Sequence, residues 1–114
     1  HTAFITGCQT GFGHRLARRL LLEGYRVIAT DSLTEGLADR LLDGFEPEVC
    51  ARLTVLDLDV RSGERVQALA KTIAPKVNLV VNNAGFGVFG TQEETDLEQV
   101  RDLFDVNVLG PARV

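Results

Sequence analysis

Short apolar runs alternate with longer amphipathic segments along the 114-residue chain. The apolar runs are continuous rather than alternating, which is typical of strands buried on both faces. The amphipathic segments place apolar residues three and four positions apart, on one face of a helix. We predict strands at 2–6, 26–30, 53–58 and 77–81, and helices at 14–23, 33–42, 63–74 and from 97 onwards.

Glycine, proline and capping residues mark the expected ends of the helices. A serine or aspartate directly before a helix can accept a hydrogen bond from its first turn, and glycine or proline stops or bends a helix. The expected N-caps are Ser62 and Asp96, and the expected breakers are Gly24, Gly44, Pro47, Pro75 and the pair Gly110-Pro111, which should end or kink the last helix.

The regular order of strand and helix predicts an α/β fold with a doubly wound parallel sheet of about four strands. The length suits one domain, which we assign to residues 1–114. Such a sheet binds its ligand outside the carboxyl ends of the strands. The motifs considered below all follow the carboxyl end of a predicted strand.

Composition narrows the function classes. The chain is 45% apolar and carries a net charge of −4, so neither disorder nor binding to nucleic acid or an anionic membrane is expected. It holds no apolar run long enough for a membrane segment. The basic cluster Arg15, Arg18 and Arg19 is expected on a solvated helix face. Cys8 and Cys50 are too few for a metal site or a disulfide framework, and they favour reduced thiols in the cytoplasm.

A glycine-rich turn follows the first predicted strand. Glycines there let the backbone approach a pyrophosphate, and the following helix offers free N–H groups and the positive end of its dipole. A turn rich in glycine for steric reasons alone is the alternative. The candidate cofactor-binding residues in this turn are Gly7, Cys8, Gln9, Thr10, Gly11, Phe12 and Gly13.

Asp31 follows the second strand and lies 18 residues after Gly13. An acidic residue at this place accepts hydrogen bonds from the ribose hydroxyls of a dinucleotide, and it would repel a 2′-phosphate. No Arg or Lys lies in the glycine turn or next to Asp31 in the sequence. We therefore expect NAD rather than NADP, with a solvated turn aspartate as the alternative.

Two further motifs follow the third and fourth strands. In Asp57-Leu58-Asp59-Val60, one carboxylate can accept from an adenine amino group while Val60 packs on the ring. In Asn82-Asn83-Ala84-Gly85, the amides can bond neighbouring strand ends, and the small residues admit a ligand. Either segment could instead be a plain turn. The next segment, 85–90, also fits G-x-G-x-x-G, but it opens no helix, and we interpret it as a substrate-side loop.

These motifs together resemble the short-chain dehydrogenase/reductase family, whose fold is the Rossmann fold. The family pattern T-G-x-x-x-G-x-G is matched at 6–13, D-[VL] at 59–60, N-N-A-G at 82–85 and F-x-V-N-V-x-G at 104–110. Order and spacing agree over the whole chain. The resemblance implies an oxidoreductase that moves a hydride between a nicotinamide and an alcohol or carbonyl substrate.

The resemblance also implies roles for single residues. Gly7, Gly11 and Gly13 would hold the pyrophosphate, Asp31 the ribose and Asp59 the adenine. The segment Asn83, Ala84 and Gly85 would line the cofactor. Asn107 would match the family's catalytic Asn, which holds a water in a proton relay; its alternative is a helix residue bonded to backbone.

The family's catalytic Ser, Tyr and Lys have no match in this sequence. The only tyrosine is Tyr25, and Ala29 stands where its partner lysine would be. In the family these residues come after the point where this chain stops, so we expect a cofactor-binding half that is inactive alone. The helix from residue 97 belongs to a subunit interface in the family, which implies a homo-oligomer. Within this chain we expect Leu103, Phe104 and Val108 to be exposed.

The glycine turn looks most like that of family members acting on retinoids or hydroxysteroids. Two other classes stay open: a non-catalytic nucleotide-binding module and a methyltransferase-type domain, which uses a similar glycine loop and acids. The Asn82 to Gly85 segment and the surroundings of Asn107 argue against the methyltransferase.

Overall fold

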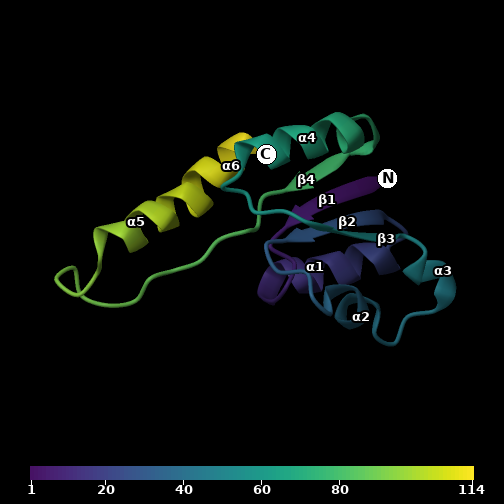
Figure 1. The fold of residues 1–114 in the computed structure, drawn as a ribbon. Helices are drawn as coiled ribbons and strands as arrows, with labels where there is room; N and C mark the ends of the chain where they lie inside the picture. Colours follow the sequence, from purple (N-terminus) through teal and green to yellow (C-terminus); the bar gives the residue numbers. More distant parts are fainter.

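The computed structural model describes residues 1–114 and has a four-stranded parallel sheet with the order β3-β2-β1-β4 (Figure 1). The strands are β1 (Thr2–Thr6), β2 (Arg26–Asp31), β3 (Leu53–Asp57) and β4 (Leu79–Val81). In the register Phe4 lies beside Ile28 of β2 and beside Val80 of β4. The chain reverses its winding direction between β1 and β4, so the predicted doubly wound fold is confirmed.

Helices cover both faces of the sheet (Figure 1). One face carries α1 (Gly11–Leu22), α2 (Leu37–Leu42) and α3 (Pro47–Cys50). The other carries α4 (Gly63–Ile73), which is followed by the 3₁₀ turn η1 (Ala74–Lys76). The last helical stretch consists of α5 (Leu97–Phe104), the π-helical η2 (Asp105–Leu109) and α6 (Gly110–Arg113).

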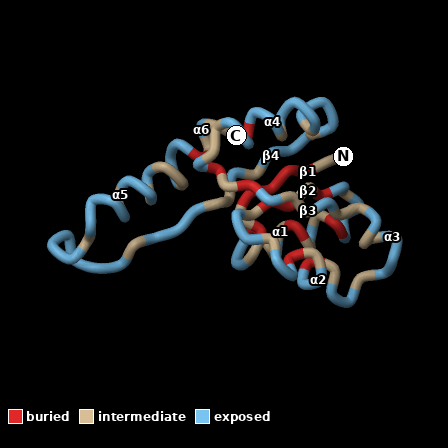
Figure 2. Tube along the Cα trace, in the orientation of Figure 1, coloured by how far each residue is buried: buried red, intermediate tan, exposed pale blue.

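Strand alternation divides the core into two clusters. Ala3, Ile5 and Val27 face α1 and α2 in a cluster of nine buried residues. Phe4 points to the opposite face and packs with Val66 of α4 in a cluster of four. The buried positions therefore gather along the sheet and α1, as Figure 2 shows, and become sparse towards α5.

The predicted helix ends need four corrections. The first helix begins at Gly11 rather than at residue 14, so it includes part of the glycine turn. The second helix begins at Leu37 rather than at residue 33, because Gly36 takes a left-handed conformation with φ 63°. Pro47 does not merely break the chain but begins α3, where its missing N–H is harmless. Gly110-Pro111 does not end the last helix; the distortion precedes it as the π turn η2, and α6 follows.

Arg18 is also placed differently from the expected solvated face. Its guanidinium donates to the carbonyl oxygens of Arg40, Leu41 and Asp43 at 3.0, 2.9 and 2.8 Å, and it lies 4.3 Å from the ring centre of Phe45. It therefore satisfies the free carbonyls at the end of α2. Arg15 and Arg19 are exposed as expected.

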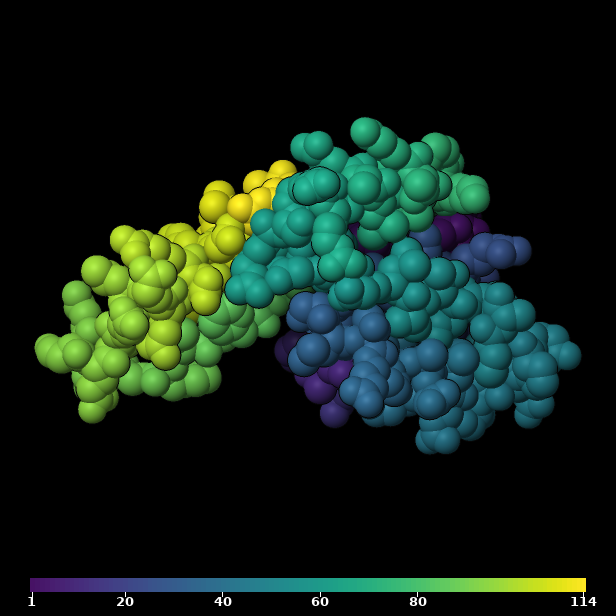
Figure 3. Space-filling view, in the orientation of Figure 1, coloured from purple at the N-terminus to yellow at the C-terminus, as the bar shows by residue number.

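The loop after β4 and the helix α5 stand away from this body (Figure 1). The segment between β4 and α5 runs outwards and returns along α5, and the space-filling view shows this part projecting from one side (Figure 3). The overall extents are 51 × 31 × 21 Å. Phe104 and Val108 are 56% and 53% exposed as predicted, whereas Leu103 is half-buried. None of the helices has the length and apolar character needed to cross a membrane.

Candidate functional site

A cavity of about 530 Å³ lies at the carboxyl ends of the strands, where the four predicted motifs meet. Parallel strands bring their carboxyl ends to one edge, so segments far apart in sequence share this space. The residues lining the cavity are Gly7, Gln9, Thr10, Gly11, Phe12, Asp31, Ser32, Leu58, Asp59, Val60, Arg61, Asn83, Ala84, Gly85, Phe86 and Val106.

The glycine turn is shaped by close backbone contacts. Gly7 has φ 71°, and a Cβ there would lie 2.7 Å from the Cα of Ala84. A Cβ on Gly13 would lie 2.3 Å from the side-chain nitrogen of Asn83 and 2.4 Å from the carbonyl oxygen of Gly7. Gly11 has φ 63° and open space around it. The missing side chains of Gly7 and Gly13 thus let the turn pack closely against Asn83 and Ala84, whereas Gly11 leaves space open at the cavity.

The N-terminus of α1 opens at this turn. Thr10 is the N-cap residue, but its side chain makes no capping hydrogen bond, and no acidic residue lies in the first turn. The first N–H groups of a helix have no partner within the helix and carry a partial positive charge. This end of α1 can therefore receive an anionic group such as a phosphate.

Cys8 belongs to the turn but not to the cavity. Its side chain is fully buried, its Sγ lies 3.4 Å from the Ile5 carbonyl oxygen, and its N–H donates to Thr30 at 3.0 Å. Burial raises the pKa of the Cys8 thiol to about 12. The thiol is therefore protonated near neutral pH and packs as a small apolar group. Gly13 likewise lies beneath the cavity surface.

Asp31 joins the second strand to the glycine turn. Its Oδ2 accepts from the Gln9 N–H at 2.9 Å, and its Oδ1 accepts from the Leu33 N–H at 3.3 Å. Arg40 of α2 donates to the side-chain oxygen of Gln9, so a cation that the sequence did not indicate lies at the glycine turn. Asp31 lines the cavity, so its carboxylate is accessible at the edge of the glycine turn.

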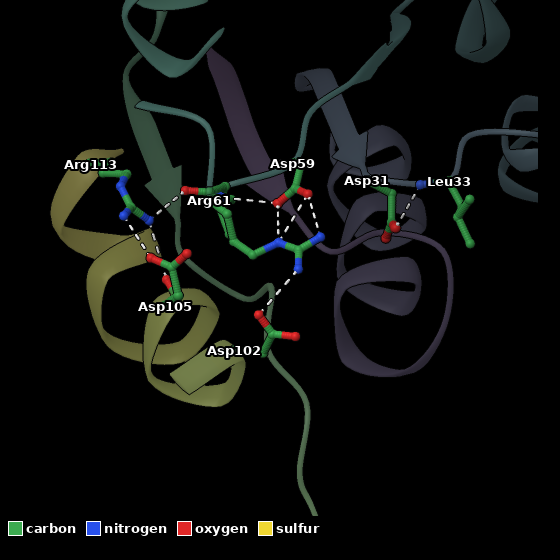
Figure 4. Close-up of polar contacts among 8 residues, drawn as sticks. Asp31, Leu33, Asp59, Arg61, Asp102, Asp105 and Arg113 are labelled. Carbon is green, nitrogen blue, oxygen red and sulfur yellow. Dashed lines mark hydrogen bonds and ion pairs between the residues drawn. The ribbon is translucent and has the colours of Figure 1, made fainter. Parts of the chain in front are cut away.

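Asp59 rather than Asp57 faces the cavity. Both carboxylate oxygens of Asp59 accept from the Arg61 guanidinium, at 2.7 to 3.1 Å, and Oδ1 also accepts from the Arg61 N–H at 2.9 Å. These hydrogen bonds lower the pKa of Asp59 and raise the pKa of Arg61. Asp57 instead pairs with Arg65 at 2.9 Å outside the cavity. Figure 4 shows Arg61 reaching on to Asp102 of α5, at 3.7 Å.

Asn83 links the carboxyl end of β4 to the carboxyl end of β1. Its side-chain nitrogen donates to the carbonyl oxygens of Thr6 and Gly7 at 2.9 and 2.8 Å. The backbone N–H groups of Asn83 and Ala84 donate to the Thr6 hydroxyl at 3.1 and 3.0 Å. The expectation that these amides bond neighbouring strand ends is confirmed for Asn83, and Asn83, Ala84 and Gly85 line the cavity.

Asn107 lies next to the cavity without lining it. Its side-chain oxygen accepts from the Phe86 N–H at 3.0 Å, and its nitrogen donates to the Phe86 carbonyl oxygen at 2.8 Å. The side chain is thus bonded to backbone, which was the alternative interpretation of this residue. A Cβ on Gly85 would lie 3.0 Å from the same side-chain oxygen, so the glycine makes room for the pair.

Five cavity residues were not singled out from the sequence as site residues. Each lies within or next to a motif or, in one case, comes from the helix that closes the site: Ser32, Leu58, Arg61, Phe86 and Val106. Adjacency was the only sequence signal for Ser32 and Arg61, whereas Leu58 lies within the third motif and Phe86 belongs to the segment interpreted as a substrate-side loop. The cavity contains no tyrosine or lysine. Tyr25 precedes β2 at the opposite edge of the sheet, with its ring 5.8 Å from that of His1.

Comparison with known proteins agrees with this geometry. The family model described as short chain dehydrogenase matches residues 1–114. Retinol dehydrogenase 7 of Mus musculus is 38% identical over 116 residues, which cover 97% of this chain and 35% of that protein. Estradiol 17-beta-dehydrogenase 1 of Rattus norvegicus is also 38% identical, with 96% and 33% covered. The chain therefore spans about a third of the length of these relatives.

Solved structures share the fold. A short-chain dehydrogenase from Streptomyces avermitilis has a TM-score of 0.84 at 36% identity, covering 98% of this chain and 40% of that one. The 3-ketoacyl-(acyl-carrier-protein) reductase of Brucella melitensis complexed with NADH has a TM-score of 0.83 at 28% identity, covering 98% and 46%. A variant of ElxO with NADPH bound has a TM-score of 0.84 at 25% identity, covering 98% and 46%.

Proposed function

The chain belongs to the short-chain dehydrogenase family, and we propose that residues 1–114 form the dinucleotide-binding domain of an NAD-dependent oxidoreductase. The nicotinamide of the bound cofactor would exchange a hydride with an alcohol or carbonyl substrate. One observation carries the proposal: four strand-end motifs, each suited to a different part of a dinucleotide, meet around one cavity of about 530 Å³.

The residues present fit the parts of a dinucleotide. The positive-φ Gly11 and the uncapped N-terminus of α1 suit the pyrophosphate, since N–H groups there are free to donate. Asp31 suits the ribose hydroxyls as an acceptor, and Asp59 suits the adenine amino group. Val60 offers an apolar surface for the adenine ring. In this proposal Cys8 and Gly13, which do not line the cavity, shape the turn rather than touch the ligand, whereas Gly7 both shapes the turn and lines the cavity.

The preference for NAD over NADP rests on the charge of Asp31. A carboxylate at this place repels a 2′-phosphate, and it is already oriented by the Gln9 and Leu33 N–H groups. Arg40 carries the charge that would favour NADP, because its guanidinium could turn from Gln9 towards a 2′-phosphate. The solved structures named above include one with NADH and one with NADPH, so they do not indicate which dinucleotide this chain prefers. The preference must follow from the residues of this chain.

Calorimetric titration of the chain with NADH and NADPH tests both whether it binds a dinucleotide and which of the two it prefers. We expect NADH to bind about tenfold tighter, equal to about 1.4 kcal/mol. Asp31→Asn should reduce the preference for NADH over NADPH, because it removes the charge but keeps an acceptor oxygen. The control is Asp57→Asn, which removes an equal charge outside the cavity. Binding of neither dinucleotide would refute the cofactor proposal, and binding of S-adenosylmethionine instead would favour a methyltransferase-type domain.

We expect the chain by itself to bind cofactor without catalysing hydride transfer. The resemblance requires a Ser, a Tyr and a Lys at the reacting carbonyl, and no tyrosine or lysine lines the cavity. A chain that binds NADH and that, supplied with NAD⁺ as hydride acceptor, oxidises no alcohol fits this proposal. Turnover by residues 1–114 alone would show that other groups carry the chemistry, and a non-catalytic nucleotide-binding role is the second candidate if no longer form is active.

Retinoid or steroid alcohols are the substrate class that we propose first. Phe12 and Phe86 line the cavity with apolar rings, and the relatives named above are a retinol dehydrogenase and an estradiol dehydrogenase. The test is oxidation of retinol and estradiol, compared with a short alcohol, by the longest natural form of the protein. A preference for the short alcohol would contradict this assignment.

Assembly and location complete the proposal. The exposed apolar residues Phe104, Val108 and Leu109 lie along one helical stretch, and we propose that they support a homo-oligomer. Sedimentation should detect a smaller species for Phe104→Glu, whereas Leu22→Glu on α1, 58% exposed, is the control. The two free thiols favour the reducing cytoplasm, which microscopy of a tagged full-length protein can check.

A further inference from the structure

A π-helical turn, η2, interrupts the helix that carries Asn107. In this turn the Gly110 N–H donates to the Asp105 carbonyl, five residues back, instead of to the residue four back. Such turns are rare within α-helices and are enriched at functional sites. Pro111 follows the turn and has no N–H to donate to Asn107, which disfavours the α-helical pattern locally; contacts from other segments can then hold the turn in its π-helical register.

Arg113, in the helix that follows this turn, bonds back to Asp105, the first residue of the turn. Its Nη1 donates to the Asp105 carbonyl oxygen at 3.3 Å, and its Nη2 donates to the Asp105 carboxylate at 2.6 Å. The pair is the most sheltered ion pair of the chain, with side chains 27% and 33% exposed. The Arg101–Glu98 pair on the same helical stretch has 71% and 73%. Figure 4 shows Arg113 lying against Asp105.

The same guanidinium ties the turn to the cavity wall. Nη1 of Arg113 also donates to the carbonyl oxygen of Val60 at 3.2 Å, and Val60 lines the cavity. Gly110 is buried against Val60, where a Cβ would come within 2.8 Å of the valine Cγ2. The π turn is therefore docked on the segment that follows β3.

Asn107 lies inside this turn and depends on its register. An α-helix advances about 100° per residue, so removing the extra residue would rotate one part of the helix against the other by about that angle. Such a rotation would separate the Asn107 amide from the backbone of Phe86, to which it makes two hydrogen bonds. Phe86 is itself a cavity residue.

We propose that Arg113 is a positioning residue, which keeps η2 in its π-helical register and thereby holds Asn107 on Phe86 at the cavity. Its relevance to catalysis rests on the function proposed above, but the register itself does not. Arg113 acts through Asp105 and Val60, and it touches neither the cavity nor Asn107.

Hydrogen exchange measured by NMR on the 114-residue chain, without cofactor, tests the register. The Phe86 amide proton and the Asn107 side-chain amide are the reporters, and Asn107→Ala defines complete loss of the Phe86 bond. In Arg113→Leu we expect Phe86 exchange to rise on the order of tenfold and the Asn107 signals to shift. Arg101→Leu, which removes the exposed ion pair of the same helix, should change neither reporter.

Asp105→Asn provides a milder variant, because Arg113 keeps its bonds to the two carbonyl oxygens. Its effect on Phe86 should lie between those of wild type and Arg113→Leu. Unchanged reporters in both variants would overturn the proposal. Loss of protection at Ile5 and Ala29 of the sheet as well would also overturn it, because Arg113 would then support the whole fold. A wild-type chain that binds no NADH would refute the proposed function while leaving these exchange results valid.

Discussion

The two faces of the sheet are built from similar sequence patterns but are packed to different extents. The face covered by α1 and α2 holds nine buried residues in one cluster, whereas the face covered by α4 holds four. α1 buries Gly13, Ala17 and Leu21, whereas the equally amphipathic α5 buries no residue. Local signals therefore specify a helix, but burial depends on what the rest of the molecule places against it.

The same difference in packing separates the two walls of the cavity. The glycine turn and Asp31 belong to the closely packed side, where backbone contacts leave no room for a Cβ at Gly7 or Gly13. Asp59, Arg61 and Val106 belong to the open side, where exposed ion pairs join the segments. We expect mutations on the first side to cost more stability than comparable mutations on the second.

The largest difference is expected between two apolar truncations. Leu21→Ala removes a fully buried side chain and should lower the free energy of unfolding by about 2–5 kcal/mol. Phe104→Ala removes a side chain that is 56% exposed and should change it by no more than about 0.5 kcal/mol. Urea denaturation measures both, and equal losses would contradict the comparison.

A glycine substitution should come next. In Gly13→Ala the new Cβ would collide with Asn83 and the Gly7 carbonyl, so we expect a loss of about 1–3 kcal/mol. Gly63→Ala is the matched control, since its nearest neighbour would be 3.8 Å away. Thermal unfolding followed by circular dichroism compares the two. A Gly13→Ala protein as stable as Gly63→Ala would disprove the steric account.

Replacing a helix N-cap should have a smaller effect on stability, and the effect should differ between α4 and α5. Ser62 accepts from the Arg65 N–H at 3.3 Å in α4, and Asp96 accepts from the Glu98 N–H at 3.1 Å in α5. Replacement of either by Ala should cost about 1 kcal/mol locally. Because α4 packs on the sheet through Val66, Ser62→Ala should lower global stability, whereas Asp96→Ala should only raise amide exchange within α5. Global unfolding at a lower urea concentration in Asp96→Ala would show that α5 is coupled to the core.

The smallest effect is expected from the Asp59–Arg61 pair. Both side chains are partly exposed, so Arg61→Gln should cost only about 0.2–1 kcal/mol. The pKa of Asp59 is lower in the folded chain, so this contribution is present above the unfolded pKa of about 3.9 and is lost as pH falls through the folded value. The stabilities of wild type and Arg61→Gln, measured by urea titration, should therefore begin to approach each other below about pH 4 and become equal once the pH is below the folded pKa of Asp59. A difference that persists at lower pH would mean that the carboxylate is not its source.

Periodicity and turn chemistry were enough to predict the fold class and most elements. Continuous apolar runs predicted the four strands, and Ser62 and Asp96 predicted helix starts correctly because capping is a contact between residues a few positions apart. Strand-end placement likewise predicted that Asp31, Asp59 and Asn83 would lie at one edge. These properties depend on neighbours in the sequence or on a general rule of parallel sheets.

Tertiary structure alone decided which side chain of each motif turns to the cavity and what holds it there. Cys8 turns into the core while Gln9 faces the cavity, and Asp57 turns away to pair with Arg65, whereas the resemblance had already singled out Asp59. The bonds from Arg113 to Val60 and from Asn107 to Phe86 join residues 53 and 21 positions apart. No local pattern encodes such contacts, because they exist only once the sheet has brought the segments together and the packing has excluded the other arrangements.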